Sequence, residues 1–249
     1  MEIPIIIAAR NEELHIGSTL DALSRQDSGV EPVIVVNGST DATADIARQA
    51  GARVIESDEG KMIAIQAGLR HLGKKSLGPL LILDSDSRPM FKGWSSRLTG
   101  ELTQLPVENP AIVWGPYIFN GEINPVLGLV LSATSMQVSW ADRNSSSPRT
   151  VRGGNTGLRL DMQTLERLLS LENYWPREDV AIFDTLKEGG GNKKVVFHPE
   201  AWVKSSGHRA TTALKRIIKE RRDPNAVYDE LYAADAPPNS RPYDSPYHG

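Results

Sequence analysis

The sequence predicts an α/β fold in one large domain, with a mostly parallel sheet flanked by helices. Short apolar runs recur at residues 3–9, 32–36, 54–55 and 80–83, and each is bounded by residues that favour turns. Segments with helical spacing of apolar residues lie between these runs. Strands that alternate with helices at this interval form right-handed crossover units, which build parallel sheets.

The first crossover begins with the isoleucine-rich run 3–9, which we interpret as a buried strand. Leu14 and Ile16 open a pattern of helical spacing behind it. The second strand, 32–36, ends in the turn Asn37-Gly38, and Ser39 or Thr40 is placed to cap the helix that follows.

A further helix is expected to open at Gly60-Lys61, with Ile63 and Ala67 on its inner side. The run Leu80-Leu81-Ile82-Leu83 follows. Its four branched apolar residues have no helical periodicity, and Gly78-Pro79 stops any element that arrives from upstream. This pattern is typical of a strand that is buried on both faces.

The second half of the chain is less regular. We expect strands at 111–114, 156–160 and 195–197. Helices are expected over 125–140 and 211–222, and two more are expected to begin at Asp161, with Met162 on the apolar side, and at 176. The segment 233–249 is rich in proline and is interpreted as a flexible tail.

Composition narrows the function classes. A formal net charge of −3 gives no overall electrostatic case for a nucleic acid or an anionic membrane as partner. The absence of cysteine excludes disulfides and thiolate metal sites. No basic segment followed by a long apolar core opens the chain, and the stretch 125–136 is too short to span a bilayer. We therefore expect a cytoplasmic protein without an integral membrane segment, and peripheral association with a membrane stays open.

The candidate chemistry centres on Asp84-Ser85-Asp86, directly after the fourth strand. Ligands of open α/β sheets bind beyond the carboxyl ends of the strands. Two carboxylates at that place suit Mg²⁺ or Mn²⁺, which prefer oxygen ligands and substrate phosphates. The alternative from the residues alone is a turn in which Asp84 and Asp86 accept hydrogen bonds from main-chain amides.

Five segments, in this order, resemble the family-2 glycosyltransferases, which have the GT-A fold. They are residues 5–13, residues 35–43, Gly60-Lys61 with 67–69, Asp84-Ser85-Asp86, and Glu178-Asp179 with 198–201. The resemblance implies metal-dependent transfer of a hexose or pentose from a nucleotide-diphosphate donor to a hydroxyl acceptor, with inversion expected and retention left open. It also implies that 1–95 is the half that binds the nucleotide sugar and that 96–232 carries the acceptor site and the catalytic base.

The resemblance assigns roles to individual residues. The implied donor site consists of Ala8, Arg10, Glu12, Asn37, Lys61, Asp84, Ser85 and Asp86. Asp86 would bind Mn²⁺ or Mg²⁺ directly, Asp84 would face the ribose or a metal-bound water, and His208 would be a further metal ligand. The chain departs from the family at Val36, where most members have a carboxylate, and at Gln66, which replaces the usual asparagine.

Catalysis is assigned by the resemblance to Asp179, as the general base that removes the proton of the acceptor hydroxyl, with Glu178 beside it. A helix N-terminus would favour the ionised form of Asp179, and general-base catalysis contributes roughly 10²–10⁴-fold. The alternative is that Glu178-Asp179 only caps its helix.

Two other functions are weighed against glycosyl transfer. A nucleotidyltransferase would also use paired carboxylates, but it should carry a glycine-rich loop where this chain has Ala8-Ala9-Arg10-Asn11. The second alternative is a catalytically inactive module that binds a nucleotide sugar or a nucleic acid. If the protein is a glycosyltransferase, a nucleic acid stays open as its acceptor. An NAD-linked oxidoreductase is disfavoured because no Gly-x-Gly-x-x-Gly follows a strand.

Overall fold

The computed structural model describes residues 2–104, 109–119, 125–142, 154–174, 178–188, 194–206 and 239–240. The first half of the chain forms β1 (Ile3–Ala9), α1 (Ile16–Ser24), β2 (Val30–Asn37), α2 (Thr43–Gln49), β3 (Arg53–Ser57), α3 (Lys61–Leu72), the 3-10 helix η1 (Gly73–Leu77) and β4 (Leu80–Leu83). The second half forms β5 (Ser87–Pro89), α4 (Trp94–Thr103), β6 (Ala111–Trp114), β7 (Tyr117–Phe119), α5 (Pro125–Asp142), β8 (Asn155–Arg159), α6 (Met162–Ser170), α7 (Glu178–Glu188), β9 (Lys194–Phe197) and β10 (Val203–Ser205).

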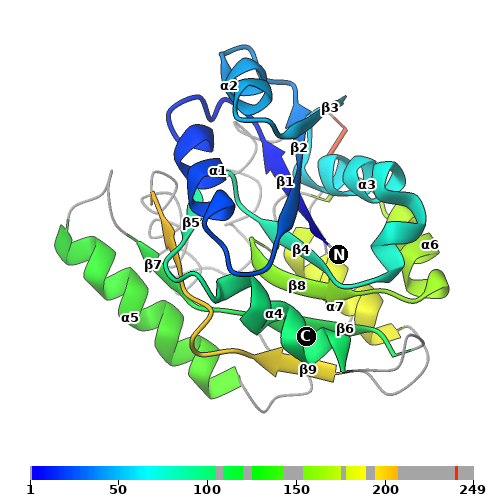
Figure 1. The fold of residues 1–249 in the computed structure, drawn as a ribbon. Coiled ribbons are helices and arrows are strands. Elements are labelled where there is room, and N and C mark those ends of the chain that lie inside the picture. Colours follow the sequence, from blue (N-terminus) through cyan, green and yellow to red (C-terminus); the bar gives the residue numbers. More distant parts are fainter. Residues whose placement is uncertain are drawn as a thin grey trace.

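The main sheet has seven strands in the order β3-β2-β1-β4-β8-β6-β9 (Figure 1). The pairs β3–β2, β2–β1, β1–β4 and β6–β9 are parallel. β8 runs antiparallel to both of its neighbours, β4 and β6. The predicted α/β fold with a mostly parallel sheet is therefore confirmed, and the reversed strand β8 is a feature that the sequence did not indicate.

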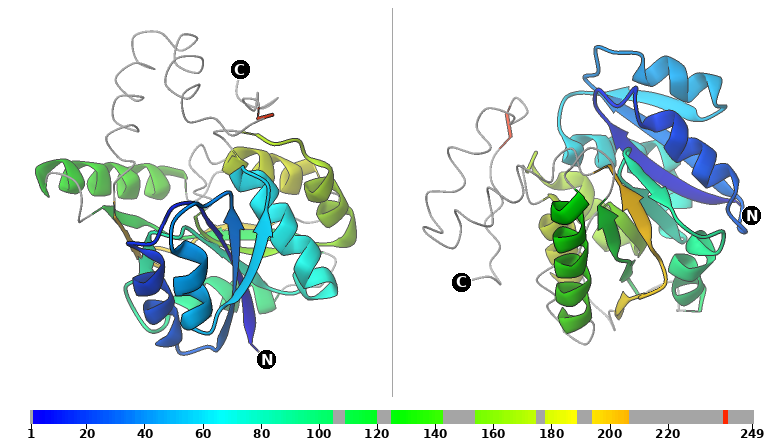
Figure 2. Two further views of the ribbon diagram at one scale, coloured as in Figure 1. Left: turned by 90° about the horizontal axis from the view of Figure 1, so that it is seen from above. Right: turned by 90° about the vertical axis from the view of Figure 1, so that its left-hand side faces the viewer.

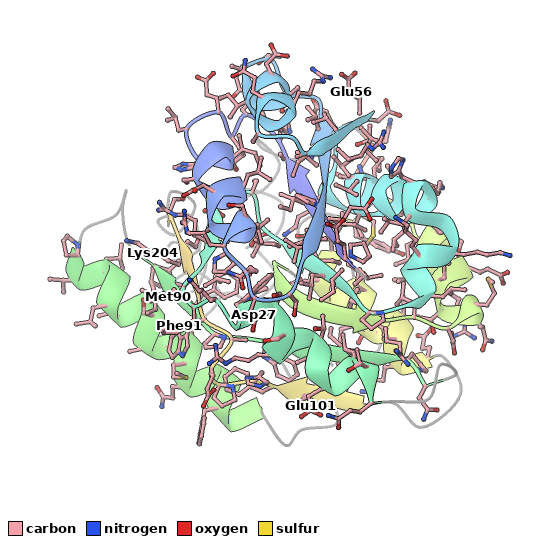
Figure 3. All side chains as sticks on the ribbon, in the orientation of Figure 1. Asp27, Glu56, Met90, Phe91, Glu101 and Lys204 are labelled. Atoms are coloured by element: carbon pink, nitrogen blue, oxygen red, sulfur yellow. The ribbon has the colours of Figure 1, made fainter. Side chains whose placement is uncertain are left out.

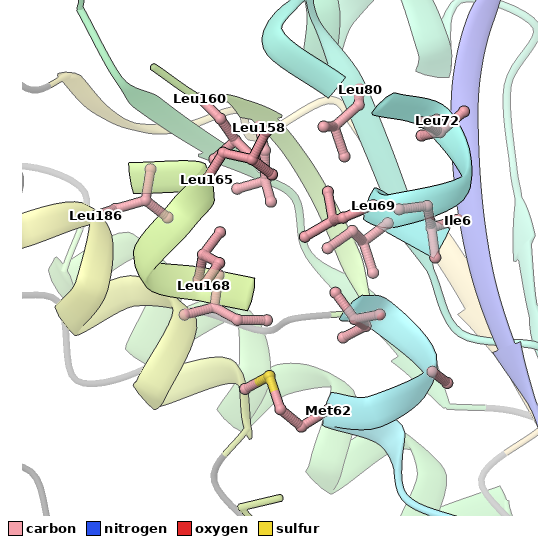
Figure 4. Close-up of a cluster of buried hydrophobic side chains, with 14 of the residues drawn as sticks. Ile6, Met62, Leu69, Leu72, Leu80, Leu158, Leu160, Leu165, Leu168 and Leu186 are labelled. Carbon is pink, nitrogen blue, oxygen red and sulfur yellow. The ribbon is translucent and has the colours of Figure 1, made fainter. Parts of the chain in front are cut away.

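The core has two layers because the strands are apolar on both faces. Ile6, Leu80 and Ile82 pack on one face under α3, α6 and α7 (Figure 4). Ile5, Ile7, Leu81 and Leu83 pack on the other face under α1, α2 and α4. All four residues of β4 are at most 2% exposed, so the expected strand with two buried faces is confirmed.

A second, three-stranded sheet in the order β5-β10-β7 lies beside the main sheet. β10 is antiparallel to β5 and parallel to β7. Helix α5 packs against β7 through Leu131 and Phe119, on the side of the molecule away from α3 (Figure 2). Because β5 starts immediately after Asp86, this small sheet links β10 to the paired carboxylates.

Side chains on the outside of the small sheet are partly exposed. Lys204 of β10 lies opposite Arg88 of β5, and the main-chain N–H of Met90 donates to the Trp202 carbonyl over 3.1 Å. Figure 3 shows Lys204, Met90 and Phe91 near one another, and Asp27 near the start of α4. The Ser96 hydroxyl of α4 donates to Asp27 over 2.8 Å. Burial alone would raise the pKa of Asp27, but this hydrogen bond and those from Ser28 and Ser95 lower it.

Three details of the predicted helices are wrong. Leu14 is 80% exposed, because the Glu12 carbonyl accepts from the N–H groups of His15 and Ile16 and leaves Leu14 at the tip of a turn. The inner face of α3 centres on Met62, Ile65 and Leu69, and Ala67 packs against the same cluster as expected, but Ile63 is only partly buried and lies outside that cluster. Met162 is 52% exposed, because α6 turns Leu165 and Leu168 toward the core instead.

The caps differ in part from expectation. α2 begins at Thr43 without a side-chain cap at its N-cap residue, so the predicted cap by Ser39 or Thr40 is wrong. Asp161 caps α6 as expected, since its carboxylate accepts from the Thr164 N–H over 2.7 Å. The predicted basic helix 211–222 lies outside the described residues, as does all of the predicted tail except Asn239 and Ser240. In the described part of the chain, no helix has the length and apolar character needed to cross a bilayer.

Candidate active site

The carboxyl ends of β2, β1 and β4 lie side by side at one edge of the main sheet, because these strands are parallel neighbours. The segments that follow them contain most of the residues that the sequence analysis selected. Arg10 and Glu12 come after β1, Asn37 ends β2, and Asp84 comes directly after β4. This edge is where open α/β sheets bind ligands.

The loop after β1 is attached to the turn after β2 by side-chain hydrogen bonds. The Asn37 amide donates to the Ala9 carbonyl over 3.2 Å, the Ser39 hydroxyl accepts from the Asn11 N–H over 3.0 Å, and the Thr43 hydroxyl accepts from the Glu12 N–H over 2.8 Å. Asn11 has a φ of 53°, a backbone conformation that asparagine tolerates better than most residues. The loop therefore has a defined conformation.

The predicted donor residues on this loop differ in exposure. Glu12 and Asn37 are 3% and 5% exposed, and Ala8 is half-buried in the sheet. Arg10 extends further out, and its guanidinium lies 2.9 Å from the Glu59 carboxylate. Arg10 is thus the member of this group best placed to contact a ligand. Asn37 is buried and stabilises the loop through its hydrogen bond to the Ala9 carbonyl.

Lys61, at the start of α3, joins two carboxylates from distant parts of the chain. Its Nζ lies 2.8 Å from Oδ1 of Asp84, after β4, and 3.0 Å from Oε1 of Glu178, at the start of α7. The three side chains are largely shielded from solvent, with exposed fractions of 21%, 31% and 11% for Lys61, Asp84 and Glu178. Through Lys61, the two ion pairs connect the N-terminus of α7 to the end of β4.

Burial and charge act in opposite directions on this cluster. Burial alone would lower the pKa of Lys61, but the carboxylates of Asp84 and Glu178 outweigh it and hold that pKa above its usual value. Burial raises the pKa of Glu178, and Asp179 adds to this effect while Lys61 opposes it. Lys61 is therefore a permanent cation, and Glu178 is the carboxyl group in the cluster that gains a proton more readily than a free glutamate.

Asp84 is held on its other side as well. The Tyr117 hydroxyl donates to its Oδ2 over 3.3 Å, and its main-chain N–H donates to the Gly154 carbonyl over 3.0 Å. A Cβ atom at Gly154 would lie only 1.8 Å from Oδ2, so only glycine leaves room for the carboxylate in this position. The contacts of Gly154 and Tyr117 with Asp84 are not visible in the sequence, because they arise only when β8 and β7 are placed.

Asp86 is held by hydroxyl groups. Its Oδ2 accepts from Ser205 over 2.9 Å and from Ser206 over 2.7 Å, and the Ser87 hydroxyl lies 3.4 Å from its Oδ1. Between the two aspartates, Ser85 is buried and its carbonyl accepts from the Thr19 hydroxyl over 2.8 Å. The carboxylate of Asp84 therefore faces an ammonium group, whereas the contacts described above for Asp86 come from hydroxyl groups.

Asp179 follows Glu178 on α7. Its Oδ1 accepts from the Val180 N–H over 2.9 Å, and it is more exposed than the buried Glu178. Its charge acts on both Lys61 and Glu178, which places it near the cluster. His208, the predicted third metal ligand, lies outside the described residues.

The donor set of Asp86 fits a hard divalent cation. Hydroxyl groups that donate to a carboxylate orient it and leave it negatively charged, whereas the ammonium group on Asp84 would repel a second cation. Within the ranges that the structure describes, no group of three or more His, Asp or Glu side chains forms a complete metal site. A cation at Asp86 would also draw ligands from substrate phosphates, as Mg²⁺ and Mn²⁺ sites commonly do.

A sequence model described as glycosyl transferase family 2 matches residues 5–124. Among curated proteins, the dolichyl-phosphate hexose transferase of Haloferax volcanii is 39% identical over 69 residues, which cover 27% of this chain and 30% of that protein. The 4,4'-diaponeurosporenoate glycosyltransferase of Staphylococcus aureus is 39% identical over 74 residues, 27% of this chain and 20% of that protein. The chain thus spans less than a third of the length of these relatives.

Solved structures with a similar fold cover more of the chain. A mannosyltransferase from Pyrobaculum calidifontis, in complex with GDP-Man and Mn²⁺, has a TM-score of 0.58 at 17% identity and covers 94% of this chain and 70% of its own. Glucosyl-3-phosphoglycerate synthase from Mycobacterium tuberculosis, with Mn²⁺, UDP and phosphoglyceric acid, has a TM-score of 0.55 at 22% identity, covering 92% and 78%. At these identities the likeness concerns the fold.

Proposed function

Residues 5–124 place the chain in glycosyl transferase family 2, with the GT-A fold, and from this premise we propose that it transfers a hexose from a nucleotide diphosphate to a hydroxyl group. The observation that carries the proposal is the double ion pair of Lys61. It joins Asp84, in the segment that matches the family, to Glu178, at the start of the helix that presents Asp179. Donor and acceptor carboxylates are thereby held in one cluster.

The donor binds, in this proposal, at the edge formed by β2, β1 and β4. Arg10 contacts the nucleotide, while the buried Glu12, Asn37 and Ser85 and the half-buried Ala8 form the walls of the donor site. The half 1–95 then contains the nucleotide-sugar site and 96–232 the acceptor site. Hexose transfer is supported by the names of the relatives, a hexose transferase, a mannosyltransferase and a glucosyl-phosphoglycerate synthase.

The cofactor is Mn²⁺ or Mg²⁺, held by Asp86, with His208 as a further ligand two residues after Ser206 in the sequence. Asp84 is the weaker candidate for direct ligation, because its Oδ1 is 2.8 Å from the Lys61 ammonium group. The ion would supply stabilisation of the negative charge on the departing diphosphate, a contribution of several kcal/mol. Both solved structures are complexes with Mn²⁺ and a nucleotide or nucleotide sugar, which supports this choice.

Asp179 is the proposed general base. The N-terminus of α7 favours a carboxylate there, and Asp179 is more exposed than Glu178. Glu178 is less suited to the role, because it is engaged with Lys61 at 3.0 Å. Removal of the proton from the acceptor hydroxyl lets its oxygen attack the anomeric carbon as the diphosphate leaves, and attack from the opposite face gives inversion.

The acceptor is a hydroxyl-bearing molecule. One curated relative is named a dolichyl-phosphate hexose transferase and another a 4,4'-diaponeurosporenoate glycosyltransferase, so a lipid is the class we would test first, with a nucleic acid acceptor as the comparison. Nucleotidyl transfer is not favoured, since the loop after β1 is held by Asn37, Ser39 and Thr43 side chains and not by a glycine-rich sequence.

The test screens UDP- and GDP-hexoses with Mn²⁺ in two ways. A thermal-shift assay measures donor binding, and the slow hydrolysis of the donor without an acceptor measures turnover. We expect one donor to raise the melting temperature only when Mn²⁺ is present, and Asp86→Ala to remove both the shift and the hydrolysis. Lys75→Met, in an exposed ion pair with Glu31, is the control and should behave as the unchanged protein. Donor hydrolysis that persists in Asp86→Ala with a chelator would contradict the proposal.

A further inference from the structure

Arg10 and Glu59 form an ion pair at the edge of the main sheet where the donor is proposed to bind. Arg10 follows β1, Glu59 lies between β3 and α3, and the guanidinium is 2.9 Å from Oε2 of the carboxylate. The exposed fractions of the two side chains are 37% and 32%, so both are within reach of a ligand. An ion pair this exposed adds little to the stability of the fold, so stability alone does not explain its position.

The turn after β2 limits where Glu59 can lie. Gly38 has a φ of 75°, and a Cβ atom built on it would be 2.6 Å from Cγ and 3.1 Å from Oε1 of Glu59. The Glu59 side chain therefore packs against the main chain of this turn, and only glycine leaves it that room. Because β2 lies between β1 and β3, three neighbouring strands bring Arg10, Gly38 and Glu59 together (Figure 1).

Three other acidic side chains near this edge are engaged in the fold. Glu12 is 3% exposed, and the Glu13 carboxylate accepts from the Ala42 N–H over 3.0 Å. Asp41 accepts from two main-chain N–H groups, over 3.0 and 3.1 Å. Among the residues that the structure describes, Oε2 of Glu59 faces the Arg10 guanidinium and Oε1 accepts no hydrogen bond. The pair thus presents an acceptor and a donor side by side.

The strand order places this pair at the end of the site opposite the paired aspartates. Asp84 follows β4, and β2 lies two strands away from β4, roughly 10 Å across the sheet. Glu59 and Lys61 are two residues apart, yet Lys61 contacts Asp84 whereas Glu59 contacts Arg10. A nucleotide whose diphosphate lies beyond β4 would therefore bring its base toward Arg10 and Glu59.

The nucleotide bases differ in what they offer to such a pair. The pairing edge of guanine has an acceptor, O6, followed by two donors, N1–H and the N2 amino group. A carboxylate can accept from both donors while a neighbouring guanidinium donates to O6. Uracil has a single donor, N3–H, between two carbonyl oxygens, so a carboxylate oxygen would face an oxygen atom of the base. Opposed acceptors of this kind select against the wrong ligand.

We propose that Glu59 and Arg10 select guanine as the base of the donor nucleotide, so that the donor is a GDP-hexose. The inference rests on the proposed function, because it takes the donor to lie along this edge. Hydrogen bonds to a charged group change affinity by about 10- to 100-fold. The carboxylate of Glu59 alone would therefore separate GDP from UDP by at least the lower of these factors.

The experiment measures the dissociation constants of GDP, UDP and inosine diphosphate with saturating Mn²⁺ by isothermal titration calorimetry. The unchanged protein is expected to bind GDP about 10-fold or more tightly than UDP, with inosine diphosphate, which lacks the N2 amino group, in between. Glu59→Gln keeps the shape of the side chain but exchanges one acceptor oxygen for an amide donor. It should weaken GDP binding by about 10-fold or more, leave UDP binding nearly unchanged, and remove the difference between GDP and inosine diphosphate.

Glu56→Gln is the matched control, because Glu56 is also a glutamate of the β3 segment, is 74% exposed and pairs with Arg48 over 3.3 Å (Figure 3). This variant should bind all three nucleotides as the unchanged protein does. A preference of the unchanged protein for UDP, or an equal loss of GDP and UDP binding in Glu59→Gln, would overturn the inference and leave the proposed glycosyl transfer standing. If neither GDP nor UDP binds with Mn²⁺, the proposed function is wrong and the inference fails with it.

Discussion

Replacing Lys61 by methionine removes the ammonium group that separates two carboxylates and keeps a side chain of similar length. Glu178, whose side chain is only 11% exposed, would then be buried without a cation, next to Asp84 and near Asp179. Removing one partner of a buried ion pair lowers the free energy of unfolding by about 3–5 kcal/mol. Because the side chain of Asp84 is 31% exposed and can be screened by water, we expect the lower end of that range, about 3 kcal/mol at pH 8.

The loss of unfolding free energy in Lys61→Met should depend on pH, and the protonation of Glu178 determines the direction of that dependence. Burial already raises the pKa of Glu178 and Lys61 counteracts it, so the methionine variant raises this pKa further. A group whose pKa is higher in the folded than in the unfolded state stabilises the fold below its unfolded pKa, and this stability is lost as the pH rises through the folded value. The difference in unfolding free energy between the unchanged protein and Lys61→Met is therefore smaller at pH 5 than at pH 8.

Urea denaturation at pH 5 and pH 8, followed by circular dichroism, measures both effects. The double variant Lys61→Met with Glu178→Gln removes the unpaired charge and should recover most of the stability at pH 8, a coupling that a double-mutant cycle isolates. Lys75→Met is the control: its ion pair with Glu31 also measures 2.8 Å, but the lysine side chain is 64% exposed, so we expect a loss below about 1 kcal/mol. Equal losses at the two pH values with no recovery in the double variant would refute the reasoning.

Three further predictions concern the surrounding residues. Gly154→Ala should displace the Asp84 carboxylate, since the added Cβ would lie 1.8 Å from its Oδ2, and lower kcat/KM by about 100-fold, as measured by initial rates; an active variant would mean that the position of Asp84 is unimportant. Asn155→Leu should lower the unfolding free energy by about 3–5 kcal/mol in urea denaturation, because the buried amide accepts from Trp94 and donates to two main-chain carbonyls; a loss below about 1 kcal/mol would contradict this. Asp179→Asn should reduce kcat by about 10²–10⁴-fold and leave the dissociation constant of the donor, measured by calorimetry, nearly unchanged; a loss confined to donor binding would rule out the role of general base.

The first half of the fold was predictable because local patterns determine it. The apolar run of β4 between Gly78-Pro79 and Asp84 indicated both the strand and the place of the carboxylates. The order of strands and helices indicated parallel pairing, which the registers of β1 with β2 and of β2 with β3 confirm. β1, β2 and β3 each pair with a strand only one helix away, so sequence spacing carries the information there, whereas β4 crosses back to pair with β1.

The second half was less predictable because its contacts join distant segments. The strands β5 and β10 have three residues each, too few to show the alternation that identifies a strand. Asn155 is fully buried and joins Trp94 to the segments before β7 and β10, contacts that no local pattern around it indicates. Gln66, noted as a departure from the family, donates to the carbonyls of Leu168 and Leu171 and so attaches α3 to the end of α6.

The position of β8 has a consequence for how the chain reaches its native state. β4 pairs with β1 early in the sequence, but its other edge is completed only by β8, with Leu83 opposite Asn155. During synthesis, the hydrophobic edge of β4 has no partner until that much later strand has emerged, and exposed strand edges promote aggregation. A fragment that ends near residue 124 would match the family and yet present this unpaired edge to other chains, so we expect it to be insoluble without residues 155–159.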